Sequence, residues 1–295
     1  MTQGTATAVA HGAATIINAM ATGKGAAFGV DLWTKTEVKL TNDPGIIEAQ
    51  ILSDPTENTR LIERTVLRVL TRFKMTKKLG AKVKTHSNIP IARGLKSSSA
   101  AANATALATV AALGKSLDDL TVINMGVDAA FDAKVTITGA FDDACASFLG
   151  GIVLTDNVKR VLSMRVSLPE GLSVLFHVPP KKAYTAATRV NKLRTVAPLV
   201  NIAYREAENA NFWQALSLNG IIYSFALGFD PSIALEALHL GAVAAGLCGK
   251  GPAVTAVVPY DKVDKVQALL QEYEGEVIKA HLNMEKASAV KRWQM

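Results

Sequence analysis

The sequence contains few of the cysteines that cross-link small secreted proteins or hold metal ions. Among its 295 residues there are only two cysteines, Cys145 and Cys248, and they lie far apart in the chain. Two such cysteines cannot form a disulfide framework or a cysteine-based metal cage. The five histidines also lack the spacing that is typical of zinc ligands. The cysteine usage therefore favours a reducing compartment, and we expect a cytoplasmic location.

Long hydrophobic runs are absent as well. The mean hydropathy is +0.21, yet no uninterrupted apolar run reaches the roughly 18–20 residues that cross a bilayer. The longest candidate, residues 100–113, is broken by Asn103 and several threonines. The first ten residues contain no Lys or Arg, so they lack the basic region of a signal peptide. These absences predict a protein that neither spans nor binds a membrane.

Aromatic residues are scarce, at 6% of the chain. The excess of 32 Lys and Arg over 25 Asp and Glu gives a formal net charge of +7. Such an excess is compatible with nucleic acid, with anionic metabolites or simply with solubility. Nucleic-acid-binding surfaces usually interleave basic and aromatic residues. We therefore expect no nucleic-acid partner, and a basic nucleic-acid-binding protein is the alternative from another functional class.

The chain length and the hydrophobic pattern predict two domains, since a domain typically has about 150 residues. Strands and helices mix in both halves, so the expected fold class is α+β. Polar residues and Pro169 interrupt the pattern, and we place the boundary between residues 1–160 and 161–295. The expected strands include 30–40, 82–89, 135–138, 172–178 and 277–282. The expected helices include 56–79, an alanine-rich segment ending near 113, 118–132 and 261–273.

The strongest functional signal is a turn rich in glycine and serine, followed by the alanine-rich helix. It comprises Pro90, Ile91, Ala92, Arg93, Gly94, Leu95, Lys96, Ser97, Ser98, Ser99 and Ala100. Glycine permits close backbone approach, and serine is a preferred residue at a helix start. A helix N-terminus offers free N–H groups and about half a positive charge, to which Arg93 and Lys96 add cations. We favour a cradle for a di- or triphosphate over an ordinary capped helix, which needs only one serine.

Two segments, 94–100 (GLKSSSA) and 138–145 (TGAFDDAC), resemble the GHMP kinase superfamily and, within it, the archaeal-type shikimate kinases. Residues 22–32 look like the first motif of that superfamily, and 245–255 look like the third, a glycine-rich loop that packs against the phosphate cradle. The Gly-Glu-His of galactokinase-like members is absent, with residues 18–20 (NAM) in its approximate place. That departure argues against a sugar substrate.

The resemblance implies a two-domain GHMP kinase fold. Its N-terminal α+β domain would contain a left-handed crossover, and its C-terminal domain would be ferredoxin-like. ATP would lie in the cleft between the two. The low charged fraction of 19% leaves room for a buried interface, so a homodimer is possible.

Adjacent carboxylates at Asp142 and Asp143 are the candidate catalytic groups. Transfer of the γ-phosphoryl group of ATP to an alcohol needs an oriented hydroxyl and a group that accepts its proton. Neighbouring residues on a helix point about 100° apart, so at most one of the two faces the phosphate squarely. Two acids stabilised by a helix dipole are the alternative. The resemblance implies that Asp142 is the base, with Asp143 capping the helix or carrying a second role.

Magnesium should bridge the phosphates, because Mg²⁺ prefers few protein oxygens and several waters. Ser98, at the start of the alanine-rich helix, is the expected hydroxyl ligand. Many members of the superfamily add a Glu on the helix before the catalytic segment. Ala130 stands near that position here, flanked by Asp128 and Asp132, and we expect one of these aspartates to help hold the metal.

The resemblance also implies an acceptor, shikimate, that carries a carboxylate and three hydroxyls. An arginine matches a carboxylate with two parallel hydrogen bonds, so Arg189 and Arg194 are candidates, together with Lys24. A solvated basic helix explains these residues equally well. Gly249 and Gly251 would let the third loop approach the substrate closely.

The function implied is phosphorylation of shikimate at its 3-hydroxyl by ATP, giving shikimate 3-phosphate and ADP for the synthesis of aromatic amino acids. A kinase of the same superfamily that acts on another small alcohol, such as homoserine, is the alternative within the class.

Overall fold

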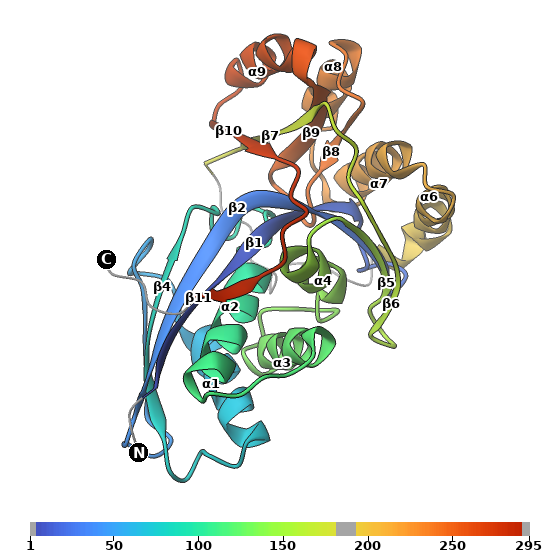
Figure 1. The fold of residues 1–295 in the computed structure, drawn as a ribbon. Coiled ribbons are helices and arrows are strands. Elements are labelled where there is room, and N and C mark those ends of the chain that lie inside the picture. The colour runs from blue at the N-terminus through green and yellow to red at the C-terminus, as the bar shows by residue number, and fades with distance from the viewer. Residues whose placement is uncertain (1–3, 181–192, 291–295) are drawn as a thin grey trace.

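The computed structural model describes residues 4–180 and 193–290, which form two β-sheets with helices on their faces (Figure 1). The first sheet has seven strands, in the order β11-β1-β2-β4-β3, with β5 also paired to β2 and β6 paired to β5. Its strands are β1 (Thr5–Ile17), β2 (Lys24–Thr41), β3 (Ile47–Ile51), β4 (Gly80–Ser87), β5 (Ile152–Asp156), β6 (Val161–Val166) and β11 (Ser288–Val290). Only the β3–β4 pair is parallel; the other pairings in this sheet are antiparallel.

Alternation along β2 explains why this sheet is covered on one side. Val30, Leu32, Thr34, Thr36 and Val38 are buried, whereas the residues between them are exposed or half-buried. Successive side chains of a strand point to opposite faces, so one face is buried and the other meets solvent. This confirms the strand that the sequence predicts for residues 30–40.

Four helices lie on the buried side of the first sheet (Figure 1). They are α1 (Arg60–Arg72), α2 (Ser97–Ala112), α3 (Asp119–Asp132) and α4 (Phe141–Leu149). Three of them contact the strands of the sheet, and α3 packs on those three. The central one, α2, contacts β1, β2 and the other three helices, and its small residues are buried on nearly all sides. A helix that is apolar all round belongs inside a core. Its alanines let the neighbouring backbones approach, whereas its first turn is partly open, with Ser97 half-buried and Ser98 exposed.

The second sheet has the order β10-β7-β9-β8 and is antiparallel throughout. Its strands are β7 (Leu172–Val178), β8 (Ala244–Leu247), β9 (Val254–Pro259) and β10 (Glu276–His281). Val174 and Phe176 pack into a core shared with β1 and β2. Leu175, between them, packs against α8 (Ser232–His239) and α9 (Val263–Gln271). Two more helices, α6 (Ala197–Glu208) and α7 (Phe212–Leu227), contribute to the shared core.

The α+β class is confirmed, and most predicted elements are found near their expected positions. The helix expected at 56–79 is shorter, because α1 ends at Arg72. The strand expected at 135–138 is wrong: these residues form a loop between α3 and α4, bounded by Lys134 and Ala140 with positive φ. No sheet edge pairs with this loop in the described structure. The strands β1, β3, β5, β6 and β11 were not predicted.

The division of the chain at residue 160 stays a prediction. β6 and β11, which lie after that residue, belong to the first sheet. Among the described residues, no helix is long and apolar enough to span a bilayer.

Candidate active site

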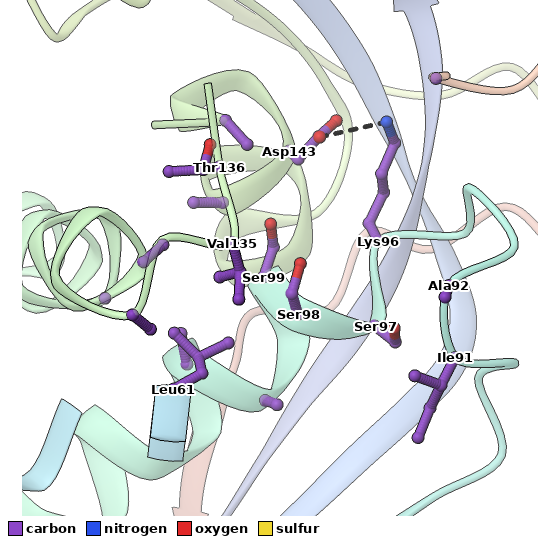
Figure 2. Close-up of a pocket in the computed structure, with 18 of the residues that line it drawn as sticks. Leu61, Ile91, Ala92, Lys96, Ser97, Ser98, Ser99, Val135, Thr136 and Asp143 are labelled. Carbon is purple, nitrogen blue, oxygen red and sulfur yellow. Dashed lines mark ion pairs between the residues drawn. The ribbon is translucent and has the colours of Figure 1, made fainter. Parts of the chain in front are cut away.

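A cavity of about 470 Å³ lies where the first turns of α2 and α4 meet the loop between β8 and β9 (Figure 2). Its wall also includes the loop at 135–139, the turn after β1, the start of α1 and part of α3. Segments that are far apart in the sequence therefore converge on one space. Both the serine-rich turn and the aspartate pair open into it.

The first turn of α2 points its serines into this cavity. Ser97, Ser98 and Ser99 all line it. The sequence suggested a serine at the start of the helix, but the N-cap is Lys96, in a left-handed conformation with φ 65°. No side chain in the described part of the chain caps the helix. The N–H groups of a first helical turn have no partner within the helix, so this end is able to receive an anion. The expectation of a phosphate cradle gains a structural basis here.

Lys96 turns away from the helix and pairs with an aspartate. Its Nζ lies 3.1 Å from Oδ2 of Asp143 on α4, and both side chains are 11% exposed. Burial raises the pKa of Asp143, and Lys96 offsets part of that rise. Burial also opposes the charge of Lys96, but Asp143 and its neighbours keep the pKa of the lysine above its ordinary value. The second carboxylate oxygen of Asp143, Oδ1, is buried and has no hydrogen-bond partner among the described residues.

Asp142 is held by an asparagine at the end of β5. Its Oδ1 accepts a hydrogen bond of 2.7 Å from Nδ2 of Asn157, and its backbone N–H donates to Oδ1 of the same residue. Burial, and then the charge of Asp143, raises the pKa of Asp142 to about 7. A Cβ on Gly25 of β2 would lie 2.4 Å from Oδ2 of Asp142, so glycine at that position makes room for the carboxylate. Asp142 is thus a buried carboxyl that changes charge near neutral pH.

The loop between β8 and β9 is fixed against the serine-rich turn. Sγ of Cys248 donates to the carbonyl of Gly94 at 3.2 Å, and Ala253 N–H donates to the carbonyl of Arg93. Asn18 Nδ2 donates to the carbonyl of Gly249 at 2.8 Å. A Cβ on Gly249, whose φ is +60°, would lie 2.6 Å from Nζ of Lys96. The loop therefore packs as closely as the third motif implied, and the glycine leaves space for the ammonium.

The predicted ATP-binding residues divide into three groups. Those that line the cavity are Ile91, Ala92, Gly94, Lys96, Ser97, Ser98 and Ser99. Leu95 and Ala100 are buried in the core beneath it. Pro90 and Arg93 line a separate cavity of about 350 Å³, where Arg93 donates to the carbonyl of Pro179. Arg93 is therefore not the fixed cation beside the cradle that the sequence suggested.

The predicted metal ligands are likewise split. Ser98 lines the cavity, whereas Asp128 and Asp132 do not. Asp128 pairs with Arg160 at 2.7 Å, and Asp132 accepts two hydrogen bonds from Arg68 on α1. Their positions on α3 direct them to these arginines instead of to the cradle. Within residues 4–180 and 193–290, no group of three or more His, Cys, Asp or Glu side chains is placed to hold a metal.

Of the predicted substrate contacts, the structure brings one to the cavity. Gly249 lines it, but Gly251, Lys24 and Arg194 do not. Nζ of Lys24 lies 5.0 Å from the centre of the Tyr204 ring, and Arg194 is exposed on a short 3₁₀ helix, Arg194–Val196. Arg189 lies outside the described residues.

Sequence reasoning missed Asn157 and Lys250. Asn157 follows β5 and would be recognised only by its contact with Asp142 across 15 positions. Lys250 lies within the predicted third loop and lines the cavity. Its place in a Gly-Lys-Gly sequence was the one available signal.

Comparison with known proteins identifies the family. The profile of the GHMP kinases N terminal domain matches residues 60–151. A shikimate kinase of Methanosarcina mazei is 46% identical over 287 residues, which are 97% of this chain and 97% of that protein. The chain belongs to the GHMP kinase family, in the branch of these shikimate kinases.

Other members of the GHMP kinase family support the same placement. A shikimate kinase of Pyrococcus furiosus is 42% identical over 267 residues, covering 90% of this chain and 95% of that protein. The crystal structure of a homoserine kinase from Cytophaga hutchinsonii superposes with a TM-score of 0.75 at 16% identity, covering 98% of both chains. At that identity, the likeness to the homoserine kinase shows that the two proteins share the GHMP kinase fold.

Proposed function

We propose that this GHMP kinase transfers the γ-phosphoryl group of ATP to the 3-hydroxyl of shikimate, giving shikimate 3-phosphate and ADP. The observation that carries the proposal is the convergence in one cavity of an uncapped helix N-terminus and two buried carboxylates. Relatives named shikimate kinase are 46% and 42% identical over 97% and 90% of this chain, which supports the choice of acceptor.

The cavity has two chemically different ends, which suit the two substrates. Leu61, Ala130 and Val135 give one end an apolar wall beside the exposed Arg60 and Lys134, as suits the base and sugar of a nucleotide. Lys96 and Asp143 lie at the other end, and Ser98 stands between the two ends in Figure 2. A nucleotide bound with its phosphates at the first turn of α2 would direct its γ-phosphate toward the aspartates. The acceptor would then occupy the charged end.

The residues at the cradle fit a magnesium ion. The Ser98 hydroxyl lines the cavity beside the helix N-terminus, and Mg²⁺ commonly takes one or two protein oxygens together with phosphates and waters. Ser98 is the residue that would hold it. When bound, Mg²⁺ screens the negative charge of the phosphates.

The chain's own groups would supply orientation, proton transfer and charge balance. The helix N-terminus holds the phosphates by its N–H groups and dipole. Asp142 accepts the proton of the acceptor hydroxyl as the new P–O bond forms, and the bond to the β-phosphate oxygen breaks to release ADP. A carboxyl whose pKa is about 7 is well matched to that task near neutral pH. Lys96 places a positive charge beside the reacting groups.

The test is an assay of ADP release by the purified protein with MgATP and single acceptors. Shikimate should support release, whereas homoserine, mevalonate and galactose should not. The product should be shikimate phosphorylated at the 3-hydroxyl, which phosphorus and proton NMR distinguish from the other positions. Release with homoserine and none with shikimate would overturn the proposal.

A further inference from the structure

The tip of the loop between β8 and β9 presents a lysine from a rigid turn. Lys250 lies between Gly249 and Gly251, and Gly251 N–H donates to the carbonyl of Cys248 across the turn at 2.9 Å. Cys248 N–H donates to the carbonyl of Ala253, and Gly249 is held by Asn18. The backbone that carries Lys250 is thus fixed on both sides. Its half-buried side chain lines the cavity.

Lys250 lies at the charged end of the cavity. The cavity wall around it contains Asn18 and Gly249, and the charged groups of this end are Lys96 before α2 and Asp142 and Asp143 on α4. Burial, and then repulsion by Lys96, lowers the pKa of Lys250 to about 8. Two ammonium groups therefore share this end with two carboxylates, one of which, Asp142, has a pKa of about 7. A ligand that brings a negative charge would relieve the repulsion between the lysines.

We propose that Lys250 binds the carboxylate of the acceptor and so selects an anionic alcohol. The inference rests on the proposed function, because it assigns the acceptor to the charged end. Lys96 belongs to the turn at the start of α2, and Arg60 and Lys134 line the cavity beside Leu61 and Val135 at its other end. Lys24 and Arg194 do not line the cavity. In shikimate, the carboxylate and the 3-hydroxyl are attached to two ring carbons that are separated by one other ring carbon. Binding of the carboxylate by Lys250 would fix the ring while the 3-hydroxyl faces Asp142.

The experiment compares shikimate with its carboxamide, which has nearly the same shape and no charge. Steady-state constants are measured for the wild type, Lys250→Met and Lys250→Arg. Lys279→Met serves as the matched control, since Lys279 is an exposed lysine on β10. Far-UV circular dichroism and the KM for ATP report whether each variant is folded and binds nucleotide.

In the wild type, we expect kcat/KM for shikimate to exceed that for the carboxamide by about 10- to 100-fold, as a charge-assisted hydrogen bond predicts. In Lys250→Met, the KM for shikimate should rise by a similar factor, the KM for ATP should be unchanged, and the preference over the carboxamide should vanish. Lys250→Arg should keep most of the preference, and Lys279→Met all of it.

Two outcomes would overturn the inference while leaving the proposed function intact. In one, Lys250→Met keeps the preference for the carboxylate. In the other, it raises the KM for ATP alone, which would place Lys250 on the phosphates. Failure of the wild type to phosphorylate shikimate would instead count against the proposed function itself.

Discussion

Lys96 and Asp143 join the two halves of the active site: the lysine precedes α2, the aspartate lies on α4, and Nζ and Oδ2 are 3.1 Å apart. The lysine occupies a left-handed backbone position with φ 65°, a conformation that costs most side chains energy. That conformation directs the side chain away from the helix and toward Asp143. One residue thus ends the turn that we propose binds phosphate and supplies a cation beside the carboxylates.

Gly249→Ala should weaken this pair. The new Cβ would lie 2.6 Å from Nζ of Lys96, so the ammonium must move and kcat should fall. Gly228→Ala is the matched control, because Gly228 also has a positive φ, +77°, but a Cβ there would meet nothing within 4 Å. Both variants should lose about 1–2 kcal/mol of stability from the left-handed backbone. Equal kcat in the two variants would show that the position of Lys96 does not matter.

Asp142→Asn should lower kcat by about 10²- to 10⁴-fold, the usual contribution of a general base. The same variant should be more stable than the wild type at pH 8. The native pKa of about 7 lies above the ordinary 3.8, so the wild type loses stability as the pH rises between these values. Asparagine carries no charge to bury and can still accept from Asn157. Melting curves at pH 4 and pH 8 test the stability prediction, since the stability advantage of the variant over the wild type should shrink at the lower pH. A variant with normal turnover would show that Asp142 is not the base.

The pH profile of kcat/KM for shikimate should be narrow. The acid limb should follow Asp142, whose raised pKa of about 7 means that the carboxylate forms only above that pH. The alkaline limb should follow Lys250, whose lowered pKa of about 8 means that its charge is lost above that pH. Because kcat/KM reports groups of the free enzyme, Lys250→Met should remove the alkaline limb. An alkaline limb that persists in this variant must belong to another group.

Ser98→Cys should change the choice of metal. Sulfur is a poor ligand for Mg²⁺ and a good one for softer ions, so activity should fall with Mg²⁺ and recover in part with Mn²⁺ or Cd²⁺. Asp128→Asn and Asp132→Asn should keep the Mg²⁺ requirement of the wild type, since both side chains pair with arginines outside the cavity. A higher Mg²⁺ requirement in either asparagine variant would show that the substituted aspartate takes part in metal binding.

Local sequence patterns were sufficient wherever the structure depends on neighbours in the chain. The alternation of residues 30–40 fixed a half-buried strand, and Asp118 was recognisable as the start of a helix because its carboxylate accepts from Thr121 N–H only three positions on. The resemblance of residues 94–100 and 138–145 to a known family located the cradle and the aspartates, and both line one cavity. The prediction of a strand at residues 135–138 was wrong because β-branched side chains favour a strand only where a partner strand is available.

The sequence by itself determined the α+β class, the helix whose N-terminus we propose binds phosphate, and the two candidate carboxylates, because each depends on residues that are close together in the chain. Only the tertiary structure decided which charges meet. In the folded chain, Lys96 pairs with Asp143, and Asp142 accepts a hydrogen bond from Asn157. Arg93 donates to the carbonyl of Pro179, and Asp128 and Asp132 pair with arginines. The reason is physical: burial makes each charge depend on partners within a few ångströms, and packing brings those partners from distant parts of the chain.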